Sequence, residues 1–462
     1  MRIQNFARDK VFLVLCLIII VIDLLYPVTF TYDSGQYFSY FKILSGELSW
    51  ESWDPVRGAI FPIYLKIITD LFGNTINSLI IPVVFFHLLL FFIASYFVIS
   101  SFDDSYSLSK RTIWILLILV FAFIIVDPLI IGFYHAVLTE YIASTIALLS
   151  CLISYFLYKS TIRNERIRPV FFIIISILVI FAWHLKQPYF GAAIFPLILV
   201  SLFIILKQKN RTISFQVILG NIFVIFMLIV SIFLWDLILP NTGLASNQGR
   251  NTSAFIDLIW VQNKELIKSS PKDFIKNIIN NYLALSDIFY FDQENTRIDK
   301  IFSMIRASEN KTIGYRIFVY GESNMAIPTE YPESYMENIR YYSSNYYPPQ
   351  YLNRILQITT IKSTVLFDTL YLILPFIYLI FSVFLIIYKK ITNWMVIIYL
   401  CSGSALLNAI EHALLNKPVD RYLFWGYPLL LICLLITILH ILNYIYSTIR
   451  EKRQNSIKNT MG

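Results

Sequence analysis

Apolar runs of about 18 to 25 residues alternate with short polar segments along most of the chain. At 1.5 Å per residue, a helix of this length crosses about 30 Å of hydrocarbon. Helices are expected because lipid cannot satisfy free backbone groups. The pattern therefore predicts an all-α polytopic membrane protein with about ten transmembrane helices, near residues 11–30, 79–100, 112–131, 137–158, 169–186, 189–206, 213–239, 365–388, 392–410 and 422–446.

Composition and charge agree with this class and predict an orientation. Of all residues 57% are hydrophobic and 14% charged, and the mean hydropathy is +0.66. The net charge of +8 comes from Lys and Arg in every second connection, which predicts that both termini are cytoplasmic. Because these residues are scattered over short loops, nucleic acid is not an expected partner. The four cysteines all fall inside predicted spans and indicate no disulfide framework.

Three regions follow from the spans. Residues 1–239 form an N-terminal transmembrane module with an outer first loop at 31–78, and residues 365–462 form a C-terminal module with a basic cytoplasmic tail. Between them, residues 240–364 predict a mainly helical extracytoplasmic subdomain, with amphipathic patterns and the tyrosine-rich tract YMENIRYYSSNYYPPQYLNR. Those tyrosines are compatible with an interfacial aromatic belt or with stacking on sugars.

A carboxylate at the edge of the first span is the sharpest candidate for chemistry. Asp33 follows the run that ends at Phe30, and Tyr37 lies four residues later. Charged groups near hydrocarbon cost free energy unless they are paired or hydrated, so such a residue indicates function. The alternative is that Asp33 caps a short interfacial helix.

Three motifs, in order along the chain, resemble one enzyme class. The first is Asp33 after the first span, together with the downstream FPIYL and LFG of residues 61–65 and 71–73; the second is HAVLTEYIASTIALL, in which Glu140 opens a span; the third is DRYLFWGYPLLLICLL near the C-terminus. Together they resemble the integral-membrane glycosyltransferases of the GT-C class, which include the protein mannosyltransferases and aminoarabinose transferases. Many members carry two adjacent acids in the first loop, whereas Ser34 follows Asp33 here.

The resemblance implies transfer of a sugar, with inversion, from a polyprenyl-phosphate donor to a glycan, lipid or protein acceptor on the outer face. A carboxylate would take the proton of the acceptor hydroxyl, and cations would stabilise the leaving phosphate. No cofactor is certain, although a divalent cation is compatible with the chemistry. The expected site residues are Asp33, Glu140 and Asp54 for catalysis, Arg421, Lys186, Arg57 and Tyr422 for the donor phosphate and lipid, and Tyr37, His135, His184, Gln187 and His412 for substrate.

Two other functions stay open. A polysaccharide polymerase or O-antigen ligase would depend on arginines of the outer loops, such as Arg250, Arg340 and Arg354. A lipid-sugar flippase or transporter would use acids inside the spans, such as Asp23 and Asp236. In each case the expected location is a bacterial inner membrane, with the site on the outer face and membrane lipids as partners.

Overall fold

The computed structural model of the chain is helical throughout the part that it describes, with no strand in that part. The described residues are 9–25, 37, 40–49, 60–72, 79–102, 108–135, 139–163, 165, 167–186, 189–207, 210–238, 271–284, 366–367, 369–383, 392–414 and 423–461.

Five described helices are long and apolar enough to cross a membrane. They confirm a polytopic helical architecture, whereas the predicted count of ten is not confirmed. A sixth span is possible if a helix pair bent by 66° counts as one crossing. Shorter apolar helices occupy three more of the predicted ranges, at Val170–Leu185, Phe190–Leu206 and Thr369–Val383. The five long helices are α6 (Ile80–Ser100), α9 (Glu140–Ile162), α12 (Arg211–Ile238), α19 (Asn393–Leu414) and α21 (Tyr427–Met461).

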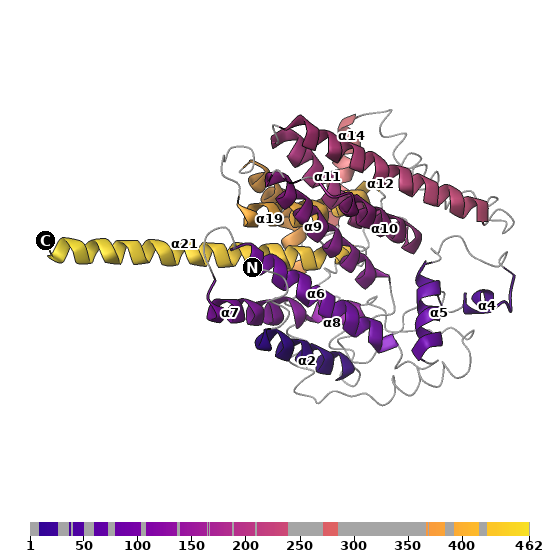
Figure 1. Cartoon of the computed structure of the whole chain (residues 1–462), viewed down its shortest axis with the longest axis horizontal. Helices are drawn as coiled ribbons and strands as arrows, with labels where there is room; N and C mark the ends of the chain where they lie inside the picture. Colours follow the sequence, from indigo (N-terminus) through magenta and orange to yellow (C-terminus); the bar gives the residue numbers. More distant parts are fainter. Residues whose placement is uncertain are drawn as a thin grey trace.

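The remaining helices complete the bundle and its periphery. Figure 1 shows α21 running through the body and projecting beyond it, while α4 and α5 lie at the other end of the molecule. These remaining helices are α2 (Lys10–Leu25), α4 (Phe41–Leu44), α5 (Ile60–Phe72), α7 (Lys110–Val120), the π-helix η3 (Phe121–Ile125), α8 (Pro128–His135), α10 (Val170–Leu185), α11 (Phe190–Lys207), α14 (Pro271–Ala284) and the 3₁₀-helix η6 (Phe424–Gly426).

Helix α9 is the centre of the bundle. It packs against α6, α10, α11, α19 and η6, and most of its side chains are buried. Small residues let its neighbours approach closely, as expected for helices in lipid. Ser150 donates a hydrogen bond to the Ala193 carbonyl of α11, and Cys151 contacts Ser404 of α19. By contrast, α12 exposes large apolar side chains such as Phe226 and Ile229.

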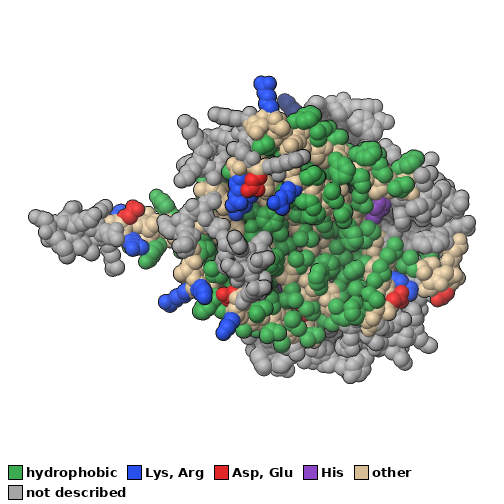
Figure 2. All heavy atoms as spheres, in the orientation of Figure 1, with side chains coloured by type: hydrophobic (Ala, Val, Ile, Leu, Met, Phe, Trp, Pro, Cys, Tyr) green, Lys and Arg blue, Asp and Glu red, His purple; other side chains and the backbone are tan. Residues whose placement is uncertain are grey.

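Basic residues gather at one end of the bundle, which we call the basic end. The amino ends of α2 and α7 meet there, because Asp9 caps α2 at the Val11 N–H and also accepts a bond from the Trp114 indole. Figure 2 shows hydrophobic side chains over the middle of one face, with most Lys and Arg on the half nearer to the projecting part of α21. This distribution is typical of a membrane protein. The basic end is defined by Lys10, Lys110, Arg111, Arg163, Arg168, Arg211 and Arg450.

Candidate functional site

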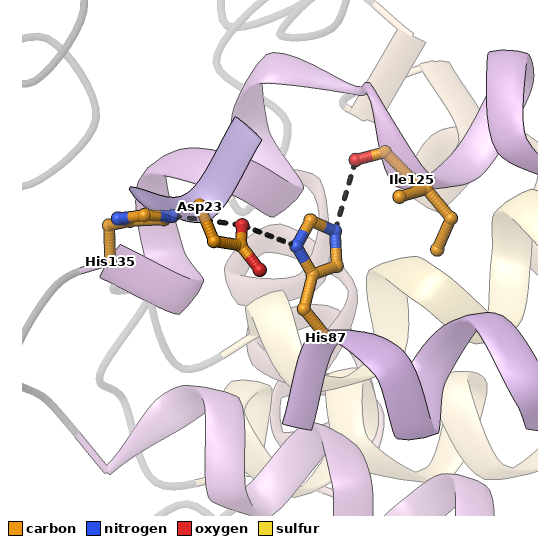
Figure 3. A network of polar contacts seen from close by, with 4 residues as sticks. All are labelled: Asp23, His87, Ile125 and His135. Carbon is orange, nitrogen blue, oxygen red and sulfur yellow. Dashed lines mark hydrogen bonds and ion pairs between the residues drawn. The ribbon is translucent and has the colours of Figure 1, made fainter. Parts of the chain in front are cut away.

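A carboxylate held between two imidazoles lies inside the bundle, toward the end opposite the basic end. Asp23 Oδ1 is 2.8 Å from His87 Nδ1 and 3.1 Å from His135 Nε2. The other nitrogen of His87, Nε2, is 3.1 Å from the Ile125 carbonyl oxygen. The side chains of Asp23, His87 and His135 are completely buried, and they come from α2, α6 and α8 (Figure 3).

The break between η3 and α8 creates the acceptor for His87. The π-helix η3 ends at Ile125, and Pro128 then begins α8, so the helix axis turns by 66°. Proline lacks an N–H and restricts the residue before it, which explains why the helix restarts there. Single-turn π-helices often occur at functional sites. The break exposes the Ile125 carbonyl to a side chain of another helix.

Asp127 stabilises the restart of the helix. Its Oδ1 accepts hydrogen bonds from the Leu129 and Ile130 N–H groups at 2.9 and 3.2 Å, in the manner of an N-cap. Its Oδ2 accepts a bond from the Tyr427 hydroxyl at 3.1 Å, which ties α8 to the start of α21. Asp127 therefore has a structural role, because it caps α8 and joins it to α21.

A second polar group surrounds Tyr189, one residue before α11. Thr139 Oγ1 is 3.2 Å from the Tyr189 hydroxyl and 3.4 Å from Glu140 Oε2. Glu140 is buried in the first turn of α9, where the helix dipole favours a negative charge. The ammonium of Lys186 lies 5.6 Å from the centre of the Tyr189 ring. Tyr189 is thus linked through Thr139 to a carboxylate and lies near a cation.

Glu411 is another buried acid at this end of the bundle. Neither carboxylate oxygen has a hydrogen-bond partner within the described part of the chain, and the side chain is 8% exposed. It lies against the first turn of α11, where a Cβ added to Gly191 would come within 2.8 Å of Glu411 Oε2. Glycine at position 191 therefore leaves the space that the carboxylate occupies.

The predicted site residues are described only in part. Of these, Lys186 lies over Tyr189, Glu140 is linked to Tyr189 through Thr139, and His135 belongs to the Asp23 network. Tyr37 is buried, with its ring edge-on to Phe61 at 4.6 Å. His184 is partly buried in the last turn of α10, and the side chain of His412 in α19 is outside the description. Outside the described residues lie Asp33, Asp54, Arg57, Gln187, Arg421 and Tyr422.

Two residues of this end were missed from the sequence. His87 lies in the predicted span 79–100, where the rule that ionisable groups inside a span are costly would have selected it. Glu411 directly follows the predicted span 392–410, whereas the structure includes it in the apolar helix. Asp23 was considered only as part of a transporter path, and its two histidine partners come from helices 64 and 112 residues away in sequence. Sequence spacing carries no signal for contacts of that separation.

In comparisons with known proteins, no family model, no curated protein and no solved structure matches this chain. Within the described residues, no group of three or more His, Cys, Asp or Glu side chains has the arrangement of a metal site.

Proposed function

We propose that the protein is an inverting membrane glycosyltransferase that uses a polyprenyl-phosphate sugar. The observation that carries the proposal is that Tyr189, at the end opposite the basic end, is linked through Thr139 to Glu140 and lies under the ammonium of Lys186. Transfer from such a donor needs carboxylates that bind and deprotonate hydroxyl groups, and a cation that stabilises the phosphate. Both kinds of group meet here at the ends of helices, in the predicted orientation on the outer face.

In the proposed reaction, an acceptor hydroxyl oxygen attacks the anomeric carbon of the sugar. The new C–O bond forms as the bond from that carbon to the phosphate oxygen breaks, and polyprenyl phosphate leaves. The hydroxyl proton passes to a carboxylate, for which Asp33 is the proposed base. Lys186 is proposed to bind the leaving phosphate together with Arg57 and Arg421, and Glu140 to hold a hydroxyl of the donor or acceptor.

Glu411 supplies additional support for a polar ligand at this end. A buried carboxylate without a partner costs free energy, which a protein tolerates more readily where a ligand supplies the missing hydrogen bonds. Sugar hydroxyls are suitable donors for both of its oxygens. The polyprenyl chain would lie along the apolar outer surface of the bundle.

Release of polyprenyl phosphate tests the proposal. Protein in nanodiscs is incubated with a panel of polyprenyl-phosphate sugars, as wild type, Asp33→Asn, Glu140→Gln and Lys186→Gln. We expect release by wild type with one sugar, and a large loss in each variant. Asp70→Asn, which breaks an exposed ion pair with Lys66 in α5, is the matched control and should keep full activity. Release that is unchanged in Asp33→Asn and Glu140→Gln would refute the assignment of the acids.

A second candidate is a proton-coupled lipid-sugar flippase, which the Asp23 network favours. Ionisable residues buried among transmembrane helices are typical of proton pathways. This candidate predicts movement of lipid-linked sugar across a proteoliposome bilayer without a new glycosidic bond. The polymerase or ligase alternative instead predicts consumption of lipid-linked oligosaccharides, with activity that depends on arginines in residues 240–364.

A further inference from the structure

The donors and acceptors around His87 determine how many protons the network holds. A carbonyl oxygen only accepts hydrogen bonds, so the 3.1 Å contact from Nε2 to Ile125 requires a hydrogen on Nε2. The other nitrogen, Nδ1, faces Asp23 Oδ1 at 2.8 Å. A neutral imidazole with its hydrogen on Nε2 would present a lone pair at Nδ1 to an ionised carboxylate. Two acceptors would then face each other in a fully buried place.

One additional proton removes this conflict. If it is on His87 Nδ1, an imidazolium donates to an ionised Asp23; if it is on Asp23 Oδ1, a carboxylic acid donates to a neutral imidazole. In both arrangements the proton lies between Nδ1 and Oδ1. Asp23 Oδ2 has no hydrogen-bond partner within the described residues, so a proton there would leave the conflict in place. His135 Nε2 contributes a second contact to the same Oδ1 at 3.1 Å.

We propose that Asp23, His87 and His135 form a binding site for one proton, and that this proton holds both ends of α8 in place. His87 binds the Ile125 carbonyl just before α8, and His135 is the last residue of α8. Both histidines meet on the same oxygen of Asp23 in α2. Loss of the proton turns the contact between Nδ1 and Oδ1 repulsive and releases the bent segment from α2 and α6.

The surrounding groups do not supply a competing charge in the described contacts. The ring of Tyr134 in α8 is 5.4 Å from that of His87, and phenol groups are neutral near pH 7. The carboxylate of Asp127 is engaged by two N–H groups and Tyr427, and that of Glu140 is contacted by Thr139. The other titratable side chains described on the packed elements are Lys10 and Cys16 of α2, Tyr96 of α6, Lys110 and Arg111 of α7, Tyr141, Cys151, Tyr155, Tyr158 and Lys159 of α9, Tyr399, Cys401 and Glu411 of α19, and Cys433, His440, Tyr444, Tyr446, Arg450, Glu451 and Lys452 of α21.

The proposal does not depend on glycosyl transfer, and its first test counts protons directly. The protein contains five histidines, so ¹⁵N-histidine spectra in lipid bilayers can be assigned by single substitutions. At pH 8 we expect no nitrogen of His87 in wild type to have the ¹⁵N chemical shift of an unprotonated nitrogen that lacks a hydrogen-bond donor. In Asp23→Asn we expect the chemical shifts of a neutral ring. The proposal would be overturned if Nδ1 of wild-type His87 were unprotonated and without a hydrogen-bond donor at pH 8, and if the His87 signals changed with pH in the same way in wild type and in Asp23→Asn.

The second test measures the hold on α8. Hydrogen exchange of residues 126–135 is followed at pH 6.5 and 9, corrected for intrinsic base catalysis, with residues 110–120 of the same bent pair as the internal control. If opening of α8 releases one proton, its protection falls by up to about tenfold per pH unit. This holds over the pH range in which the site is protonated in the folded state and unprotonated in the open state. His87→Gln keeps an amide donor but cannot bind a proton, so its corrected exchange should not depend on pH. Equal protection of wild-type α8 at both pH values would contradict the proposal.

Discussion

Removing the shared carboxylate should destabilise the bundle far more than removing an exposed one. Asp23 accepts contacts from two fully buried imidazoles at 2.8 and 3.1 Å. Asp23→Leu deletes Oδ1, which both imidazoles contact, and leaves His87 Nδ1 and His135 Nε2 facing an apolar side chain. Asp23→Asn keeps an oxygen at the same place and loses only the charge, so the two variants separate hydrogen bonding from ionisation.

The magnitude follows from the two contacts. Interhelical hydrogen bonds in membrane proteins contribute on average about 0.6 and at most about 1.7 kcal/mol each, which gives about 1 to 3 kcal/mol for two. Leaving the buried donors unsatisfied adds about 1 to 3 kcal/mol. We therefore expect Asp23→Leu to lower the free energy of unfolding by about 2 to 6 kcal/mol. We expect Asp23→Asn to lower it by only about 1 to 2 kcal/mol, because the amide keeps a hydrogen-bonding group beside both imidazoles.

Unfolding of the purified protein in mixed micelles with increasing SDS, followed by tryptophan fluorescence, measures these differences. Asp70→Leu is the control, since its ion pair with Lys66 at 2.6 Å is exposed and such pairs contribute at most about 1 kcal/mol. If Asp23→Leu were no more destabilising than Asp70→Leu, the buried network would not stabilise the fold and the reasoning would be refuted.

Three further predictions concern the other polar groups at this end. Glu411→Leu should raise the free energy of unfolding by about 1 to 3 kcal/mol in the SDS assay, because it removes a buried carboxyl with no described partner. The same variant should lower sugar transfer, and a clear loss of stability would contradict the prediction. Gly191→Ala should destabilise by about 1 to 3 kcal/mol, since its Cβ would be 2.5 Å from the Phe195 ring and 2.8 Å from Glu411 Oε2, and Glu411→Ala in the same chain should recover part of the loss. Tyr427→Phe should cost about 0.5 to 1.5 kcal/mol by deleting the bond to Asp127, and an unchanged thermal midpoint would exclude a contribution from that bond.

The apolar runs were sufficient to predict the helical membrane architecture, because length and hydropathy alone define a helix such as α6 or α9. They were not sufficient for the break after Ile125. A continuous span was predicted over 112–131, although Pro128 after Asp127 is a recognisable restart signal. Hydropathy averages over a window and does not resolve a bend within it.

The candidate site was predictable where a helix end positions a residue. Glu140 was selected because the motif in which it opens a span resembles the GT-C class, and the structure has it in the first turn of α9. Thr139, the residue before Glu140, contacts Tyr189, which is 50 residues further along the chain. No local sequence pattern indicates that contact. The same limit applies to Gly191 and Glu411, which meet across two helices. The roles assigned to all of the predicted site residues stay predictions.

The central claim is that Glu140 and Lys186 belong to a site that breaks the bond between a sugar and polyprenyl phosphate. Nanodiscs have no second compartment, so flipping alone yields no product there. The most direct measurement is therefore mass-spectrometric detection of free polyprenyl phosphate and glycosylated acceptor in nanodiscs, for wild type, Glu140→Gln and Lys186→Gln. The account predicts both products with wild type and a large loss in both variants. Intact donor with every sugar, together with movement of lipid-linked sugar in proteoliposomes, would contradict it.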